Sequence, residues 1–138
     1  MRFFSRDLIS GKLPDAAWNA AFADYRRHLE AISSQLSMNG RTLSAHYFHD
    51  AVVKTTSQTE AYYKLRLDCR PVTGSKVATL SLKFQDPQEL DGFLTRPNEE
   101  ILYHEIHLDT NSRMIFMAIT PDGEYGFSFA DVILSPAL

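Results

Sequence analysis

Alternation of apolar and polar residues with a period of two runs through most of the chain after residue 48. A β-strand sends successive side chains to opposite faces, so this period predicts strands that bury one face. Two such stretches, 61–69 and 76–84, are separated by the turn signal Thr73–Gly74 and are expected to form an antiparallel hairpin. Four more stretches predict strands: 48–56, 101–109, 113–120 and 124–134.

The first third of the chain follows a helical period instead. Ser5 is a suitable N-cap for a short helix and Gly11 is a suitable stop. After Pro14, apolar residues recur in steps of three and four, which predicts an amphipathic helix that ends at Asn39–Gly40. Such a helix would be roughly 35 Å long at about 1.5 Å per residue.

Together these patterns predict an α+β fold, with N-terminal helices, one of them long, packed on an antiparallel sheet of about six strands. The run MIFMAI, residues 114–119, is apolar on both faces and is therefore expected at the centre of the sheet. A further short helix is predicted to begin at Asp86 and to bury Leu90, Phe93 and Leu94. A chain of 138 residues suits a single domain, 1–138.

Composition narrows the classes of partner. The net charge is −3 and the pI is about 5.9, without a basic stripe, so nucleic acid is not an expected partner. The longest uninterrupted apolar run has six residues, whereas a bilayer-spanning helix needs about 20, so no membrane partner is expected. The lone cysteine, Cys69, is typical of a reducing compartment, and the N-terminus lacks the apolar core of a signal peptide. A cytoplasmic protein is expected.

The stretch YHEIH, residues 103–107, contains residue types that bind metals or transfer protons. In a strand its two histidines point to opposite faces and do not converge on one ion. His104 falls on the apolar face, where an imidazole needs a hydrogen-bond partner, and Asp50 is the expected one. This buried pair would be structural or, alternatively, a proton-transfer pair. The opposite, polar face is shared by Tyr103, Glu105, His107 and Asp109.

A second set of polar side chains lies on the strand over 61–69. If that strand and the strand over 101–109 are neighbours, their polar faces combine. Charged pairs with tyrosines are favoured at protein interfaces and are equally ordinary on a solvated sheet face. The candidate binding surface therefore comprises Tyr62, Lys64, Arg66, Tyr103, Glu105, His107 and Asp109.

Catalytic signatures are weak. The sequence contains neither a Gly-x-Ser-x-Gly nucleophile motif nor a Gly-x-x-x-x-Gly-Lys phosphate loop, so no catalytic residue, metal ligand or cofactor is assigned. The alternative is a small hydrolase or metal-binding protein. His49–Asp50 resembles the His-Asp pair of metal-dependent phosphohydrolases, and further ligands would come from His104, Glu105 and His107.

Several short strings give the chain a resemblance to a family of small uncharacterised bacterial proteins. They are the start MRFFSRDL, the strand HDAVV at 49–53, the strand LYHEI at 102–106 and the segment PDGEYGFSF. The resemblance implies a shared fold and brings no catalytic residue with it. Some small bacterial proteins of this build are immunity or accessory partners of toxins. The expected function is a non-enzymatic protein-binding or accessory module, with a protein partner or a second copy of the chain bound to it.

Overall fold

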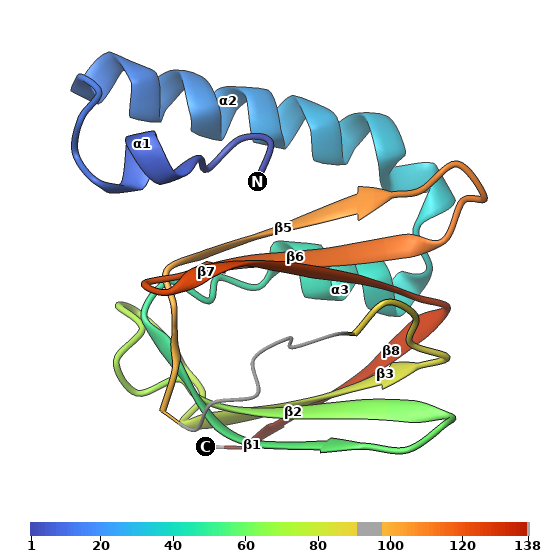
Figure 1. The fold of residues 1–138 in the computed structure, drawn as a ribbon. Coiled ribbons are helices and arrows are strands. Elements are labelled where there is room, and N and C mark those ends of the chain that lie inside the picture. Colours follow the sequence, from blue (N-terminus) through green and yellow to red (C-terminus); the bar gives the residue numbers. More distant parts are fainter. Residues whose placement is uncertain (91–97, 138) are drawn as a thin grey trace.

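The computed structural model describes residues 1–90 and 98–137, which form N-terminal helices and two antiparallel sheets (Figure 1). The helices are α1 (Arg6–Ile9), α2 (Asp15–Ile32), the 3-10 helix η1 (Ser33–Gln35) and α3 (Met38–Ala45). The strands are β1 (Ala51–Gln58), β2 (Tyr62–Asp68), β3 (Thr79–Gln85), β4 (Glu100–Ile101), β5 (Tyr103–Leu108), β6 (Met114–Thr120), β7 (Gly123–Phe129) and β8 (Asp131–Ala137).

The α+β content is confirmed, but eight strands in two sheets, counted over residues 1–90 and 98–137, replace the expected single sheet. The larger sheet has the order β4-β1-β2-β3-β8 and the smaller one β5-β6-β7. The expected hairpin is present as β2 and β3, and β6 is the central strand of its sheet. The strand expected over 124–134 is divided at Ala130 into β7 and β8, which belong to different sheets. In β7 the odd-numbered residues Phe127 and Phe129 are buried, whereas in β8 the even-numbered Val132 is buried. The alternation of buried and exposed residues therefore shifts by one residue at Ala130.

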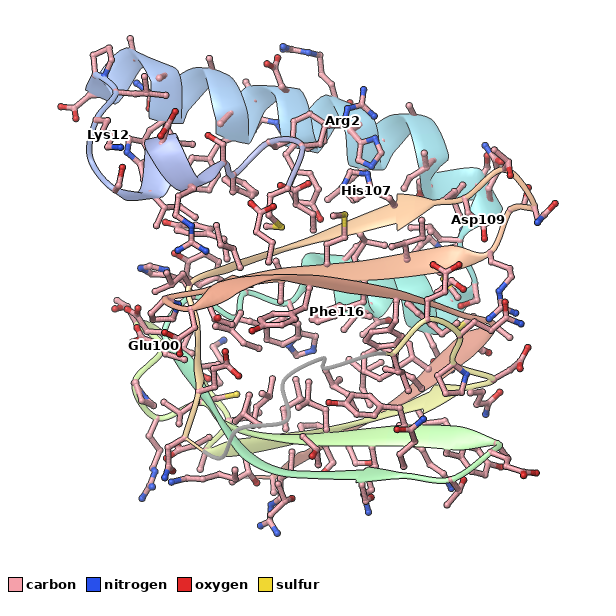
Figure 2. All side chains as sticks on the ribbon, in the orientation of Figure 1. Arg2, Lys12, Glu100, His107, Asp109 and Phe116 are labelled. Carbon is pink, nitrogen blue, oxygen red and sulfur yellow. The ribbon has the colours of Figure 1, made fainter. Side chains whose placement is uncertain are left out.

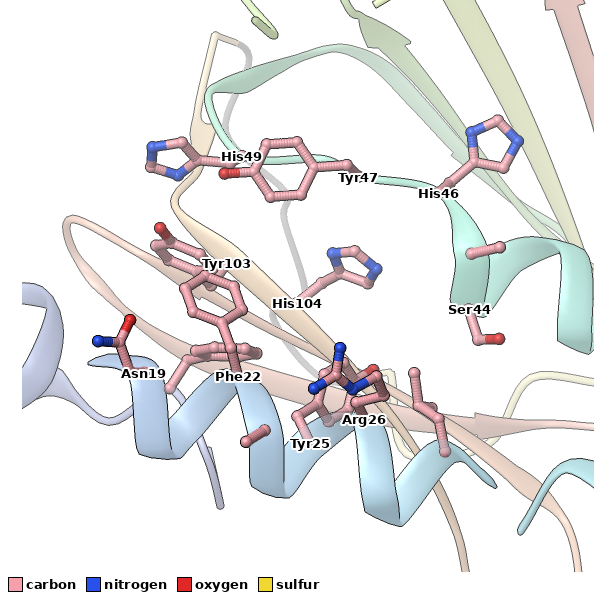
Figure 3. Close-up of a pocket in the computed structure, with 14 residues that line it drawn as sticks. Asn19, Phe22, Tyr25, Arg26, Ser44, His46, Tyr47, His49, Tyr103 and His104 are labelled. Atoms are coloured by element: carbon pink, nitrogen blue, oxygen red, sulfur yellow. The ribbon is translucent and has the colours of Figure 1, made fainter. Parts of the chain in front are cut away.

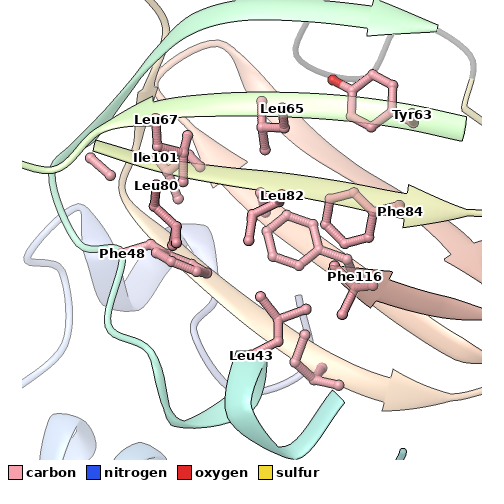
Figure 4. Close-up of a cluster of buried hydrophobic side chains, with 14 of the residues drawn as sticks. Leu43, Phe48, Tyr63, Leu65, Leu67, Leu80, Leu82, Phe84, Ile101 and Phe116 are labelled. Carbon is pink, nitrogen blue, oxygen red and sulfur yellow. The ribbon is translucent and has the colours of Figure 1, made fainter. Parts of the chain in front are cut away.

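The main hydrophobic core fills the space between the two sheets (Figure 4). Alternate residues of β2 and β3 point into it, as the period of two predicts, and β6 contributes Phe116 from the other side (Figure 2). Leu43 of α3 and Phe48 of the following segment close the core on one side. Residues of this core that are almost completely inaccessible to solvent include Leu65, Leu67, Leu80, Leu82 and Phe84.

The N-terminal segment, α1 and α2 form a third layer on the outer face of the three-stranded sheet (Figure 1). A second buried cluster lies there, built from Phe4, Leu8 and Ala21 with aromatic neighbours. Both faces of this sheet are therefore covered, as expected for the apolar strand β6. Within the described part of the chain, the structure contains no helix with the length and apolar character needed to span a membrane.

The short helix α1 begins as expected, since the Ser5 hydroxyl accepts a hydrogen bond from the Leu8 N–H at 3.3 Å. The long helix is shorter than its period suggested and ends at Ile32. Gly40, expected to end it, lies inside α3, where an added side chain would collide with Met114.

The helix expected at Asp86 is wrong for residues 86–90, which are not helical in the structure. Asp86 and Glu89 have positive φ angles of 49° and 64°, and Gln88 forms an isolated bridge to Ser128. Phe93 and Leu94 lie outside the described residues.

Candidate functional site

Strand β5, which contains YHEIH, is an edge strand, and side chains of α2 form hydrogen bonds with its backbone. The Ile106 N–H donates a hydrogen bond to the Tyr25 hydroxyl at 2.8 Å, and the Ile106 carbonyl accepts one from His28 Nε2 at 3.0 Å. Burial raises the pKa of Tyr25, so this phenol stays neutral. Two α2 side chains thus satisfy backbone groups that an open sheet edge would leave exposed.

Glu105 lies under the N-terminal segment and is completely buried. Its carboxylate accepts hydrogen bonds from three successive backbone N–H groups, those of Arg2 at 3.0 Å, Phe3 at 2.9 Å and Phe4 at 2.8 Å. Consecutive N–H groups of this kind form an anion-binding nest. Burial alone would raise the pKa of Glu105, but the bonds from His107 and from the nest outweigh it and hold that pKa below its usual value.

His107 completes the surroundings of this carboxylate. Its Nε2 donates to Glu105 Oε1 at 2.7 Å, and its ring stacks on Phe3 and lies beside His28. The expectation of a solvated polar face is therefore wrong for Glu105 and His107, which are buried because the start of the chain folds over β5. Asp109 has a structural role in the following turn, where its Oδ1 accepts from the N–H groups of Asn111 and Arg113.

His104 points to the opposite face, as the strand geometry predicts. Its ring packs against Phe48 and Phe116, with centroid distances of 4.4 and 5.8 Å, and only 7% of the residue is exposed. Its Nε2 atom is buried without a hydrogen-bond partner among the described residues. Desolvation lowers the pKa of His104 to about 3, so the imidazole is neutral at physiological pH.

The expected pairing of Asp50 with His104 is not present. The Asp50 carboxylate instead lies 3.4 Å from His49 Nε2 and is hydrogen-bonded to Glu100. That hydrogen bond, together with burial, raises the pKa of Glu100. His49 in turn donates through Nδ1 to the Leu102 carbonyl at 2.6 Å, so the pair fastens the start of β1 to the segment before β5.

The set proposed for a hydrolase or metal site does not converge. Glu105 and His107 face α2, His104 faces the main core, and His49 bonds to backbone. Among the residues that the structure describes, no group of three or more His, Cys, Asp or Glu side chains is arranged to hold a metal ion.

A cavity of about 420 Å³ lies between α2, the segment joining α3 to β1, and β5 (Figure 3). The imidazole of His104 projects from β5 into the space between the other two walls. Two large aromatic residues that line the cavity are unusually exposed, Phe22 at 44% and Tyr47 at 48%. Further lining residues include Phe4, Tyr25, Arg26, His46, His49 and Tyr103.

The electrostatic character of the cavity is neutral inside and positive at one wall. Burial lowers the pKa of His46, as it does that of His104, so both imidazoles are uncharged at neutral pH. Burial raises the pKa of Tyr103, and the neighbouring Tyr47 phenol raises it further, so Tyr103 is neutral. Arg26 is the charged residue of the lining, and none of the described lining residues is Asp or Glu.

The structure separates the two halves of the expected binding surface. Tyr62, Lys64 and Arg66 are exposed on the outer face of the five-stranded sheet, whereas the β5 residues lie in the other sheet beneath the N-terminal layer. The β2 residues are joined instead by Lys83 of β3, which pairs directly with Lys64 and lies 3.9 Å above the Tyr62 ring.

Comparison of the chain with models of protein families, with curated proteins and with solved structures gives no match. The resemblance based on HDAVV and LYHEI stays a prediction and carries no argument about the site. Sequence reasoning missed the cavity residues Phe22, Arg26 and Tyr47. The available signal was the run HYFHD at 46–50, which places four aromatic rings in five residues between a helix and a strand.

Proposed function

We propose that the protein is a cytoplasmic, non-enzymatic binding protein whose cavity between α2, residues 46–49 and β5 holds a small, mainly apolar aromatic molecule. The observation that carries the proposal is the aromatic cavity itself, which His104 enters as a neutral imidazole beside the rings of Phe4, Tyr25 and Tyr103.

The remaining walls support the same proposal. Ligand sites are typically concave, lined by aromatic side chains and supplied with a few polar groups, in volumes of roughly 300–1,000 Å³. The cavity, at about 420 Å³, falls within that range. Exposed apolar side chains such as Phe22 and Tyr47 at its wall are typical of binding surfaces.

Binding is favoured over catalysis by the state of the candidate proton-transfer groups. His49 is engaged with the Leu102 carbonyl, and the Glu105–His107 pair is used to hold the N-terminal segment. General acid–base catalysis needs a group within hydrogen-bond reach of a substrate proton, and these histidines are occupied by structural bonds.

A cavity-filling substitution tests the proposal. The probe is 2-naphthol, which is neutral at pH 7, measured by isothermal titration calorimetry. Ala23 lines the cavity, and Ala23→Trp is expected to abolish binding by occupying the space. Ala20→Trp is the matched control on the exposed side of the same helix and is expected to bind like the wild type. Absence of binding to the wild type at millimolar probe, or equal binding by both variants, would contradict the proposal.

A second candidate function is an interaction with an acidic protein segment on the outer face of the five-stranded sheet. Lys64 and Lys83 are directly opposite each other across β2 and β3, and like charges in that position are destabilising. Arg66 adds a third cation to a face whose other outward residues include Ser81 and Ser135. The test is binding of poly-L-glutamate to the wild type and to Lys64→Ser/Lys83→Ser. Equal binding by the two proteins, or tighter binding of single-stranded DNA than of the polypeptide, would refute it.

A further inference from the structure

We propose that the ligand of this cavity is an aromatic carboxylate, held with its ring against the inner wall and its anionic group at Arg26. The proposal rests on the small-molecule site proposed above and specifies its chemical class. It follows from the way charge and apolar surface are divided around the cavity.

Arg26 supplies the positive charge at the cavity. It is an exposed residue of α2, and Figure 3 shows its side chain on the side of the helix that faces His104. Among the described residues Arg26 forms neither an ion pair nor a hydrogen bond, whereas the adjacent Arg27 is paired with Asp24. A guanidinium offers a planar fork of donors that matches a carboxylate. The cation beside the cavity is thus available to an anion.

The described lining contains no negatively charged side chain to balance Arg26. A cationic ligand would meet Arg26 and, in the described lining, no carboxylate to balance its charge. A neutral ligand would leave the guanidinium unused. An anionic ligand gains an attractive partner at Arg26. Asp50, outside the lining, places its carboxylate 3.4 Å from His49 Nε2, so the lining selects for negative charge on the Arg26 side of the cavity.

The inner wall of the cavity determines which kind of molecule can carry the negative charge of the ligand. Phe4 and His104 are the buried residues of the lining and form its inner wall, at 3% and 7% exposure, and Tyr103 stacks on Phe4 at 4.9 Å. His104 and His46 are both neutral, so the inner wall offers ring faces and weak polar groups without a formal charge. A planar apolar group packs well against such a wall in offset or edge-to-face geometry. The ligand is therefore amphipathic, with a ring at one end and an anion at the other.

The volume limits the size of the ring system. A cavity of about 420 Å³ corresponds to roughly 14 water molecules at about 30 Å³ each. A carboxylate carried on one or two fused rings fits this space.

The test compares 2-naphthoate with its neutral isostere 2-naphthamide by isothermal titration calorimetry at pH 7. The wild type is expected to bind the carboxylate at least about 5-fold more tightly than the amide. Arg26→Gln is expected to weaken 2-naphthoate about 5- to 30-fold, the range for a charge-assisted hydrogen bond that solvent partly screens. The affinity of Arg26→Gln for 2-naphthamide should differ from that of the wild type by less than about 2-fold.

Arg27→Gln is the matched control, because it removes the same charge one residue away from a side chain that is not part of the lining. It is expected to leave the affinity for 2-naphthoate within about 2-fold. Equal affinities of the wild type for carboxylate and amide, or equal effects of the two arginine variants, would overturn the aromatic-carboxylate proposal while leaving the small-molecule site standing. Failure of both probes and of 2-naphthol to bind would remove both proposals.

Discussion

Replacing Glu105 by glutamine tests how far a single buried carboxylate holds the N-terminal layer. The carboxylate accepts four hydrogen bonds, three from successive backbone N–H groups and one from His107, at distances between 2.7 and 3.0 Å. A glutamine amide has one oxygen, so its NH₂ group faces either the Phe3 and Phe4 N–H groups or the Arg2 N–H group and His107, which can change tautomer and accept. One or two buried donors are thus left unsatisfied, at about 1–3 kcal/mol each.

The expected loss for Glu105→Gln is therefore roughly 3–5 kcal/mol, because the remaining hydrogen bonds also lose the charge of their acceptor. For a chain of this length that loss lowers Tm by about 10–15 °C. Differential scanning calorimetry at pH 7 measures it, with the exposed Glu30→Gln as control, for which a change below about 2 °C is expected. Amide hydrogen exchange should also become faster at Phe3 and Phe4, whose N–H groups lose an acceptor.

The pH dependence of Tm is an independent test of whether the Glu105 carboxylate stabilises the fold in its charged form. The folded-state pKa of Glu105 is lower than that of an unfolded chain, which is about 4.3. Its stabilisation is therefore fully present above the unfolded pKa and is lost as pH falls through the folded pKa. The difference in Tm between wild type and Glu105→Gln should accordingly shrink between about pH 5 and pH 2. A Tm within 3 °C of the wild type at pH 7, or a difference that grows on acidification, would refute this account of the nest.

Three further predictions concern the edge of β5, the cavity and the outer sheet face. Tyr25→Phe leaves the Ile106 N–H without its acceptor and is expected to cost about 1–2 kcal/mol by chemical denaturation, with faster exchange of that amide; unchanged exchange would contradict the contact. His104→Leu removes an unsatisfied buried nitrogen and is expected to raise Tm by several degrees while weakening 2-naphthol binding; a lowered Tm with intact binding would contradict the functional assignment. Lys64→Thr relieves repulsion with Lys83, keeps the contact of Lys83 with the Tyr62 ring and is expected to stabilise the fold by about 0.2–1 kcal/mol at low salt, a gain that should vanish in 1 M NaCl; a destabilised variant would show that the lysine pair is not repulsive.

Period-two alternation predicted most strands of this fold correctly, because side-chain parity depends only on local backbone geometry. It also placed the two histidines of YHEIH on opposite faces. What covers each face was not predictable in the same way. Glu105 reads as a solvated residue in its strand, and it is buried by residues 2–4, about a hundred positions away in the sequence.

The cavity was also not predictable from the sequence, because it depends on contacts between distant segments. Its walls come from α2, from residues 46–49 and from β5, and no local pattern states that these three segments meet. Arg26 reads as one of several cations on a solvated helix face, and only the packing of α2 along β5 distinguishes it from Arg27. The division of strands between two sheets also depends on long-range pairing, although the shift in buried parity between Phe129 and Val132 marks the point where the sheet changes.

The most direct test of the central claim is a crystal structure of the protein soaked with 2-naphthoate. The account predicts the naphthalene ring between α2 and β5, against His104, with the carboxylate within hydrogen-bond distance of the Arg26 guanidinium. A probe bound at another surface, or a cavity without probe density at a saturating concentration, would contradict it.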